Sequence, residues 1–189
     1  MPIQDLHEIV HRCTTGDTAA FRSLMEEYQG YAFSVAFRAV CDEEDAKDIV
    51  QESFIRVWNN IHRYDESVKF TTWLYRIVTN LCIDLLRSGN RRRCQPLEGM
   101  SAALLSCSDP ESDPERLYSN AELGAMIGTL MDDLPPKQRM IFLLRDLENL
   151  SIKEVCDILH LSEGSVKTNL VYARRYIRRR LELIHMNEP

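Results

Sequence analysis

The densest group of side chains able to do chemistry is a run of cations near the C-terminal end. Residues 166–180 contain six Lys or Arg side chains and no acid. At helical spacing most of these cations lie opposite an apolar row made of Val166, Leu170, Ala173, Ile177, Leu181 and Ile184. A one-sided cation array is what phosphate oxygens attract. The predicted chemistry is non-covalent binding of nucleic acid, with a merely solvated charged face as the alternative.

The segment before this run favours DNA over a solvated face. Ser151 and Glu154 have the spacing of a capping box, and Ser162 stands where the N-cap of a following helix would be. Two capped helices separated by a turn of about three residues form a helix-turn-helix, whose second helix can enter the major groove of DNA. We therefore predict that the helix beginning after Ser162 binds DNA.

Position along this helix predicts the role of each side chain. The N-terminal part of a recognition helix meets base edges, and later basic residues meet the backbone. The predicted base readers are Glu163, Ser165, Lys167, Thr168 and Val171. The predicted phosphate ligands are Arg174, Arg175, Arg178 and Arg179. Tyr176 and Arg180 lie nearer the apolar row, so we expect them to pack.

A second polar helix edge lies far upstream. Thr72, Arg76 and Asn80 are spaced four residues apart and share a face, with Lys69 and Phe70 just before it. Aromatic rings stack on unpaired bases and an amide can read a base edge, so this edge suits single-stranded nucleic acid. An ordinary solvated edge fits the same spacing, and Phe70 fits the core equally well.

A third polar face carries the opposite charge. On the helix predicted after Asp42, the side chains of Asp48, Gln51 and Glu52 lie opposite the apolar residues. Negative charge excludes DNA as the ligand of this face. A solvated surface and a protein-binding surface are the two remaining interpretations.

No group of residues predicts an enzyme, a cofactor or a metal site. We find no nucleophile with its base and no phosphate loop, and His7, His11 and Cys13 lack a fourth metal ligand nearby. The six cysteines form no tight pair, which is typical of reduced cytosolic thiols. There is no apolar run of about 18 residues, so we expect a cytoplasmic protein without direct membrane insertion, unless a membrane-bound partner holds it there.

The elements that must position these side chains are predicted to be helices throughout, because the apolar residues recur with a period near 3.6. The predicted helices cover about 18–39, 43–61, 72–87, 117–134, 136–147, 152–160 and 163–184. Residues 94–116 are rich in proline, serine and acids, which predicts a flexible linker. The expected fold is all-α, with two small helical domains, 1–93 and 117–189.

The distribution of charge supports this organisation. The net charge of −6 would by itself argue against a nucleic-acid partner. However, residues 71–93 carry five basic side chains and one acid, whereas residues 94–135 carry one basic side chain and eight acids. Cations are therefore concentrated on the two predicted nucleic-acid faces, and acids on the linker and the presumed protein-binding face.

Three stretches of the chain resemble the extracytoplasmic-function (ECF) group of bacterial sigma factors, which are small members of the sigma-70 family. The stretches are DAKDIVQESFIRVW at 45–58, FTTWLYRIVTN at 70–80, and LPPKQR at 134–139 leading into the helix-turn-helix. They occur in the family's order. The resemblance covers about 17–93 and 117–183.

The resemblance implies a non-enzymatic subunit that binds core RNA polymerase and directs it to promoter DNA. Residues 1–93 would form region 2, with Asp48, Gln51 and Glu52 docking on the clamp helices of the largest polymerase subunit. Residues 117–189 would form region 4, whose helix-turn-helix reads the minus-35 element. The residues implied in melting and binding the minus-10 element are Lys69, Phe70, Thr72, Arg76 and Asn80.

Further partners and rival functions follow from the same comparison. The resemblance implies an anti-sigma factor as a partner, and no small-molecule substrate. A stand-alone helix-turn-helix regulator would explain residues 134–183 but would leave the two upstream faces without a role. An all-helical adaptor without a DNA role would explain the acidic face but not the clustered arginines.

Overall fold

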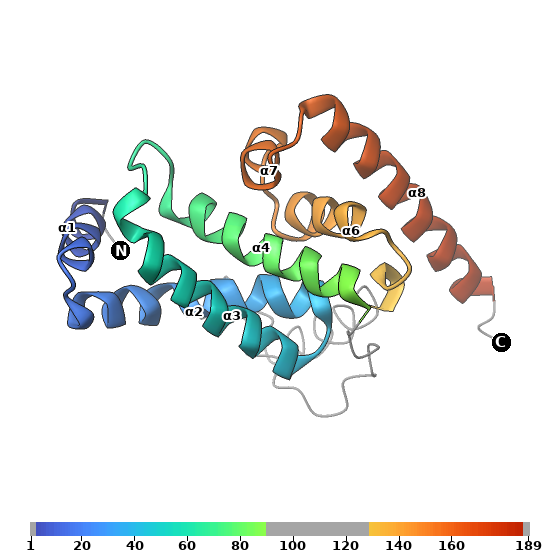
Figure 1. Cartoon of the computed structure of the whole chain (residues 1–189). Coiled ribbons are helices and arrows are strands. Elements are labelled where there is room, and N and C mark those ends of the chain that lie inside the picture. Colours follow the sequence, from blue (N-terminus) through green and yellow to red (C-terminus); the bar gives the residue numbers. More distant parts are fainter. Residues whose placement is uncertain (1–2, 90–128, 187–189) are drawn as a thin grey trace, which may run out of the picture.

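The computed structural model describes residues 3–89 and 129–186, and every regular element within them is helical (Figure 1). This confirms the all-α prediction. Side chains are described for 6–89 and 129–183. The predicted linker over 94–116 and most of the helix predicted over 117–134 lie outside these ranges.

The elements are α1 (Ile3–Thr14), α2 (Thr18–Val40), α3 (Glu43–Asn60), the short 3-10 turn η1 (Ile61–Arg63), α4 (Phe70–Ser88), α6 (Pro136–Phe142), the π-helical turn η3 (Leu143–Leu147), α7 (Ile152–Leu159) and α8 (Glu163–Met186).

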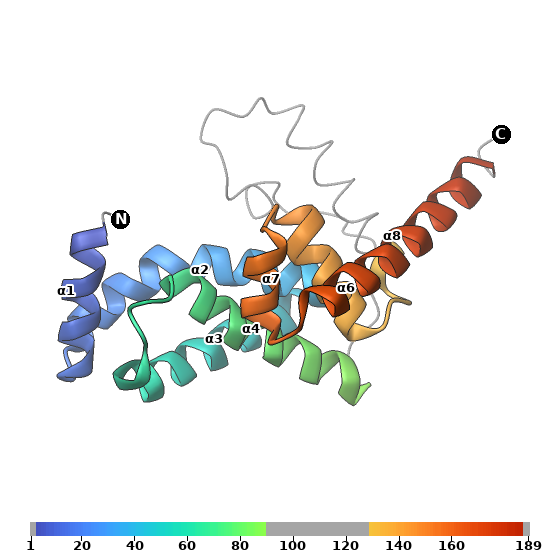
Figure 2. The ribbon, with the colours of Figure 1, turned by 90° about the horizontal axis from the view of Figure 1, so that it is seen from above.

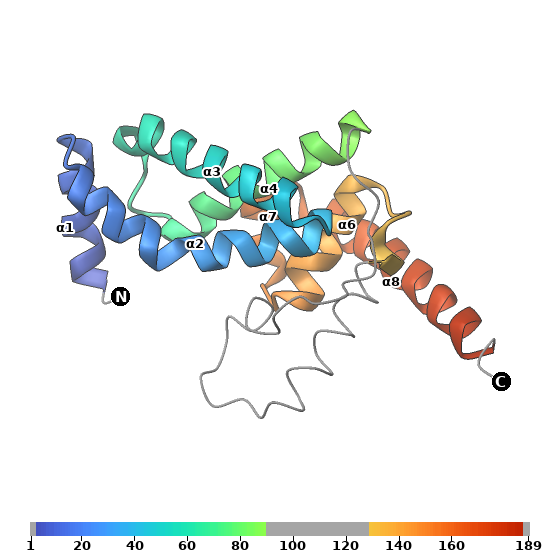
Figure 3. The same cartoon turned by 90° about the horizontal axis from the view of Figure 1, so that it is seen from below.

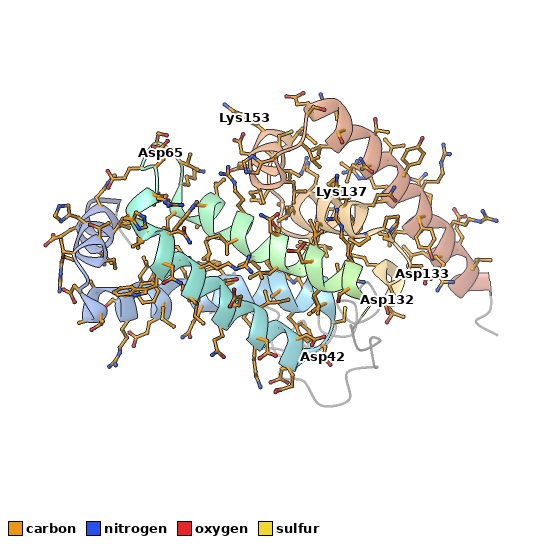
Figure 4. All side chains as sticks on the ribbon, viewed as in Figure 1. Asp42, Asp65, Asp132, Asp133, Lys137 and Lys153 are labelled. Atoms are coloured by element: carbon orange, nitrogen blue, oxygen red, sulfur yellow. The ribbon has the colours of Figure 1, made fainter. Side chains whose placement is uncertain are left out.

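The first two long helices begin with aspartate caps. The Asp17 carboxylate accepts hydrogen bonds from the backbone N–H groups of Ala19 and Ala20, at 2.9 and 3.0 Å. Asp42 accepts from the backbone N–H of Asp45 at 2.9 Å, and it lies at the start of α3 (Figure 4). Each carboxylate satisfies backbone donors that a helix N-terminus leaves unpaired, so α2 and α3 begin where the sequence predicts.

The fourth helix begins one or two residues earlier than predicted. Lys69 occupies the N-cap position of α4 without a side-chain hydrogen bond. The helix instead begins at Phe70, whose ring is only 1% exposed and contacts the rings of Tyr28, Tyr64 and Trp73. Burial of this ring, rather than a polar cap, fixes the start of α4.

The N-terminal half is a layered bundle. Helices α2 and α3 run side by side, α4 lies across them, and α1 crosses the far end of α2 (Figure 3). Its centre is made of fully buried side chains such as Leu24, Phe54, Leu74 and Val78.

The C-terminal half packs directly onto this bundle. Helices α6 and α7 pack against α4, which α7 crosses, whereas α8 projects away, so α1 and the distal end of α8 form opposite ends of the molecule (Figures 1 and 2). One buried apolar cluster runs through both halves, from Leu74 and Val78 on α4 to Val155 and Ile158 on α7. The two predicted domains therefore share a core in this conformation.

A buried cation reinforces the contact between the halves. Arg139 on α6 is 1% exposed and donates to the backbone carbonyl of Met131 at 3.2 Å and to Asp132 Oδ1 at 2.9 Å. Its second terminal nitrogen donates to Cys41 Sγ, at the end of α2, at 3.3 Å. A guanidinium taken out of water needs such partners on several sides.

The helix predicted over 136–147 is not uniform. Its first part is the α-helix α6, but its last five residues, η3, form a π-helical turn. The backbone N–H of Glu148 then donates to the carbonyl of Leu143 at 2.9 Å. The widened turn ends the helix and brings Asp146 to the side of α8, where it contacts Arg174.

Candidate nucleic-acid and protein interfaces

The basic helix α8 has the two faces that its sequence predicts. Its apolar row is buried at Val166, Leu170, Ala173 and Ile177. The predicted DNA-binding side chains are exposed, except that Ser165 is half-buried. The exposed members are Glu163, Lys167, Thr168, Val171, Arg174, Arg175, Arg178 and Arg179. The structure therefore brings all nine predicted minus-35 residues onto one helix and leaves eight of them open to solvent.

Two of the predicted base readers form an ion pair along the helix. Lys167 Nζ lies 2.7 Å from Glu163 Oε2, one turn earlier. The hydrogen bond and charge of Lys167 lower the pKa of Glu163, and the same bond raises the pKa of Lys167. Both groups stay ionised near neutral pH, and this part of the face presents a paired rather than a lone cation.

Arg174 is held by a partner that the sequence analysis missed. Its Nε and Nη2 atoms donate to the two carboxylate oxygens of Asp146, at 2.8 and 2.6 Å. The hydrogen bonds that Arg174 donates to Asp146 raise the pKa of Arg174. Such a bidentate pair fixes the plane of the guanidinium. Asp146 lies in η3, 28 positions before Arg174, so the pairing depends on tertiary packing and not on a local sequence pattern.

Asp133, which precedes α6, contacts two side chains in the C-terminal part of α8. The Tyr176 hydroxyl donates to Asp133 Oδ2 at 2.9 Å, and Arg180 Nη2 lies 3.6 Å from the same oxygen. Asp133 lies beside α8 (Figure 4). Tyr176 is half-buried and packs against the core as expected, whereas Arg180 is exposed, which corrects the expectation that it packs.

The polar edge of α4 is assembled only in part. Asn80 is exposed, Arg76 is half-buried, and Thr72 is only 9% exposed. Phe70 corrects the sequence prediction, because its ring is enclosed by three other aromatic rings and is closed to a stacking base. Phe70 is a core residue that positions the loop before α4.

Helix α7 covers this edge of α4. Arg76 Nη2 donates to the backbone carbonyl of Asp157 at 2.8 Å, and Lys69 Nζ lies 3.3 Å from Glu154 Oε1. Figure 2 shows α7 lying over α4. Lys153, on the outer side of α7, points away from α4 (Figure 4). Two of the five residues predicted to bind the minus-10 element thus contact the C-terminal half of the same chain.

The acidic face of α3 is open. Asp48 and Gln51 are exposed, and Glu52 Oε1 accepts a 2.7 Å hydrogen bond from Arg56. Ile55 lies one turn beyond Gln51 and is 47% exposed, which is unusual for a large aliphatic side chain. Ile55 was not predicted as a site residue, although its position outside the apolar stripe of this helix is a sequence signal for such a role.

Within the described part of the chain, no cluster of His, Cys, Asp and Glu side chains could hold a metal ion. Over the same residues, no helix is both long and apolar enough to span a membrane.

Comparison with known proteins identifies the family. The family Sigma-70 region 2 matches residues 24–92, and the family Sigma-70, region 4 matches residues 125–177. The ECF RNA polymerase sigma factor SigW of Bacillus subtilis is 34% identical over 170 residues, covering 88% of this chain and 91% of SigW. The chain belongs to the ECF sigma factors.

Other relatives agree with this assignment. SigE of Mycolicibacterium smegmatis is 34% identical over 167 residues, which cover 87% of this chain and 63% of SigE. The sigma-E factor of Escherichia coli is 31% identical over 173 residues, covering 89% of this chain and 90% of that protein. A structure of CnrH with the cytosolic domain of CnrY has the same fold, with a TM-score of 0.65 at 24% identity over 96% of this chain and 99% of CnrH.

The family decides between the functions that the sequence left open. An ECF sigma factor binds core RNA polymerase and promoter DNA, and directs transcription initiation. The stand-alone helix-turn-helix regulator is not favoured. A match to region 2 also accounts for the upstream half of the chain, which the regulator leaves unexplained.

Proposed function

We propose that this ECF sigma factor recognises its promoter through two separate faces and docks on core polymerase through a third. The observation that carries the proposal is the coincidence of each family match with one cation-bearing helix: α4 lies within the region 2 match and most of α8 within the region 4 match. In this proposal residues 1–93 act as the region 2 domain, 94–116 as the linker, and 117–189 as the region 4 domain.

The minus-35 element is read by α8. Lys167, Thr168 and Val171 lie in its N-terminal turns and are exposed, so they can approach base edges in the major groove. A lysine donates to guanine acceptors, and the methyl groups of threonine and valine contact thymine. The later cations, Arg174, Arg175, Arg178 and Arg179, bind backbone phosphates and set the register.

The minus-10 element is captured by the edge of α4. Arg76 and Asn80 contact unpaired bases or their phosphates, and Lys69 adds a positive charge at the N-terminus of α4. Thr72 is only 9% exposed, so Arg76 and Asn80 are the side chains of this edge that we expect to contact DNA first. Phe70 supports the loop from the core instead of stacking on a base.

Core polymerase binds the open face of α3. Asp48, Gln51 and Glu52 supply the negative and amide groups for a basic helical partner, the clamp helices of the largest polymerase subunit. Ile55 supplies apolar area on the same face, one turn beyond Gln51. An apolar centre with a polar rim is the usual anatomy of a protein interface.

The protein acts without catalytic chemistry of its own, in the bacterial cytoplasm where polymerase and chromosome are found. Two structural relatives, CnrH and the Bartonella quintana sigma factor RpoE, were solved with a protein partner, CnrY or the anti-sigma factor NepR. We extend this to the present chain, with an anti-sigma factor as its regulatory partner, which could also hold the sigma factor at the membrane.

The function is tested by runoff transcription with purified core polymerase on a pool of upstream regions. We expect specific transcripts only when sigma factor and core are both present, and their start sites give the promoter sequence.

Because each DNA face alone is small, the free chain should bind duplex promoter poorly at physiological salt. Specific footprints at nanomolar concentration without core would contradict the proposal.

Two double variants assign the faces. Arg76→Ala with Asn80→Ala should abolish promoter opening, measured by permanganate reactivity of unpaired thymines, while core binding is retained.

Asp48→Arg with Gln51→Ala should reduce core binding at least about tenfold, with the helical circular dichroism unchanged. Normal core binding by this second variant would refute the proposed docking face.

A further inference from the structure

One cation of the recognition helix α8 is held by a carboxylate from another element. Arg174 Nε and Nη2 donate to the two carboxylate oxygens of Asp146, at 2.8 and 2.6 Å. The Asp146 side chain is only 19% exposed. The other ion pair on this face, Lys167 with Glu163, lies along α8 itself, and its two side chains are 61% and 62% exposed. A shielded, bidentate pair between elements restricts its cation more than an exposed pair within one helix does.

The carboxylate of Asp146 has a rigid support. Asp146 lies in η3, in which Leu143 and Leu144 are completely buried, and this turn packs against α2, α6 and α7. The backbone N–H of Glu148 donates to the carbonyl of Leu143 at 2.9 Å and closes the turn. Asp146 therefore cannot follow the guanidinium of Arg174 if that side chain moves, and the pair fixes Arg174 relative to the body of the domain.

This geometry leaves one edge of the guanidinium available to DNA. A guanidinium carries five N–H donors in a planar fork. Asp146 accepts from Nε and from one hydrogen of Nη2, so the edge formed by Nη1 and Nη2 faces away from it. That edge can donate two parallel hydrogen bonds to phosphate oxygens. The Arg174 side chain is 51% exposed, so a phosphate can reach it.

Arg174 also lies where base reading changes to backbone binding along α8. Val171 stands one turn before it and Arg178 one turn after it, and both are exposed. Phosphate contacts fix the register and orientation of a recognition helix. A guanidinium that is already held in place loses less rotamer freedom when it binds a phosphate. A phosphate bound here would therefore define how the base-reading turns enter the major groove.

We propose that Asp146 is a positioning residue for promoter recognition: it holds Arg174 so that α8 docks on DNA in one register, and it thereby sharpens minus-35 discrimination without touching DNA. The inference rests on the proposed function of α8 as the minus-35 reader. Asp146 also lowers the net positive charge of this face, which weakens sequence-independent attraction to phosphates. Both effects favour the intact minus-35 element over other sequences.

The test uses holoenzyme reconstituted with core polymerase and a promoter obtained by the runoff experiment. Two fragments share the minus-10 element, and the minus-35 element is intact in one and scrambled in the other. The ratio of their Kd values measures minus-35 discrimination. Asp146→Asn keeps the shape of the side chain but replaces one acceptor oxygen by a donor, and should lower this ratio at least about fivefold. The loss should fall mainly on the intact fragment.

Glu182→Gln is the matched control for charge. Glu182 is exposed near the C-terminal end of α8, and its replacement makes the same change in net charge as Asp146→Asn. The control should leave the discrimination ratio unchanged, because no contact of Arg174 is altered.

A second variant tests the pair from the side of the cation, which is exposed on α8 and does not support the fold of η3. Arg174→Lys keeps the charge but cannot be held along a two-nitrogen edge. It should lower the ratio about as much as Asp146→Asn does. The double variant should lower it no further, because both substitutions remove one coupled contact.

The outcomes separate this inference from the function on which it rests. If Asp146→Asn weakens binding of both fragments equally, its role is structural and the inference is refuted. An unchanged ratio, a loss that adds to that of Arg174→Lys, or an equal loss in Glu182→Gln would refute it as well. A ratio near one for the unmodified holoenzyme would instead refute α8 as the minus-35 reader, and the inference with it.

Discussion

Ile55 is the residue whose surroundings point most directly to a partner. It is a large aliphatic side chain, 47% exposed, on a face that otherwise carries Asp48, Gln51 and Glu52. Isolated exposed aliphatic residues are common. An aliphatic residue surrounded by polar side chains on a proposed docking face is expected to be a hot spot for binding. Its burial in a complex excludes water from the surrounding polar contacts.

Replacing Ile55 by alanine tests this role. We expect Ile55→Ala to weaken binding to core polymerase about tenfold, which corresponds to about 1.4 kcal/mol. The free energy of unfolding should change little, since much of the side chain is already in water. Val171→Ala, also an exposed aliphatic truncation but on α8, is the control and should leave core affinity unchanged. Equal affinities for both variants would remove Ile55 from the interface.

At the scale of elements, α7 shows how a short helix is stabilised by its own sequence. The Ser151 hydroxyl accepts from the backbone N–H of Glu154 at 3.2 Å, and the backbone N–H of Ser151 donates to Glu154 Oε2 at 3.0 Å. This reciprocal capping box matters most in a helix of eight residues, which would not form alone in water. It also fixes Glu154 beside Lys69.

Removing the cap hydroxyl should destabilise the protein moderately. We expect Ser151→Ala to lower the free energy of unfolding by about 1 kcal/mol, because one backbone donor loses its partner. Ser23→Ala is the matched control: Ser23 lies within α2, is exposed, and bonds only a preceding carbonyl, at 3.4 Å. Alanine favours the helix there, so the control should be neutral or slightly stabilising. Urea unfolding distinguishes the two.

The same box predicts a dependence of stability on pH. Hydrogen bonds from Ser151, and to a smaller degree from Lys69, lower the pKa of Glu154 below its ordinary value of 4.5. A carboxyl whose pKa is lower in the folded state stabilises the fold above its unfolded pKa, and this contribution disappears as the pH falls through the folded pKa. The free energies of unfolding of the unmodified chain and of Glu154→Gln should therefore differ at neutral pH and converge in acid, below the lowered pKa of Glu154. A difference that persists in acid would contradict this account.

At the scale of the whole molecule, Arg139 connects three segments. It bonds Met131 and Asp132 before α6, and Cys41 at the end of α2. Because its guanidinium is 1% exposed, its charge depends on these partners instead of on water. The residue therefore contributes to the folding of the C-terminal half and to its contact with the N-terminal half.

The order of two substitutions tests this role. Asp132→Ala leaves a buried cation without its carboxylate and should lower the free energy of unfolding by about 3 kcal/mol. Arg139→Met removes the cation and keeps an apolar chain in the same space, so it should cost less than Asp132→Ala. Chemical denaturation of both variants measures the two changes. The reverse order would show that packing of the Arg139 side chain, not its charge, is what the fold requires.

Local patterns predicted the described helices from residue 18 onward, but they missed α1 and did not fix every side-chain environment. Ser151 and Ser162 cap helices as expected, and Asp17 and Asp42 do the same, because capping is decided within a few residues of sequence. Phe70 was ambiguous from spacing, since a ring before a helix fits either a stacking platform or the core. Its burial depends on three rings from α2, the loop and α4, which sequence spacing does not bring together.

The sequence by itself determined the all-helical fold, the caps, the apolar stripes and the segregation of cations from acids, because these depend on short-range periodicity and composition. Tertiary structure decided which of these surfaces are available. The contact of Arg76 with Asp157 joins residues 81 positions apart, and that of Arg38 with Glu148 joins residues 110 positions apart. Such contacts form only when two halves of the chain pack, and no local pattern encodes their geometry. The availability of each DNA face is therefore a property of the folded molecule.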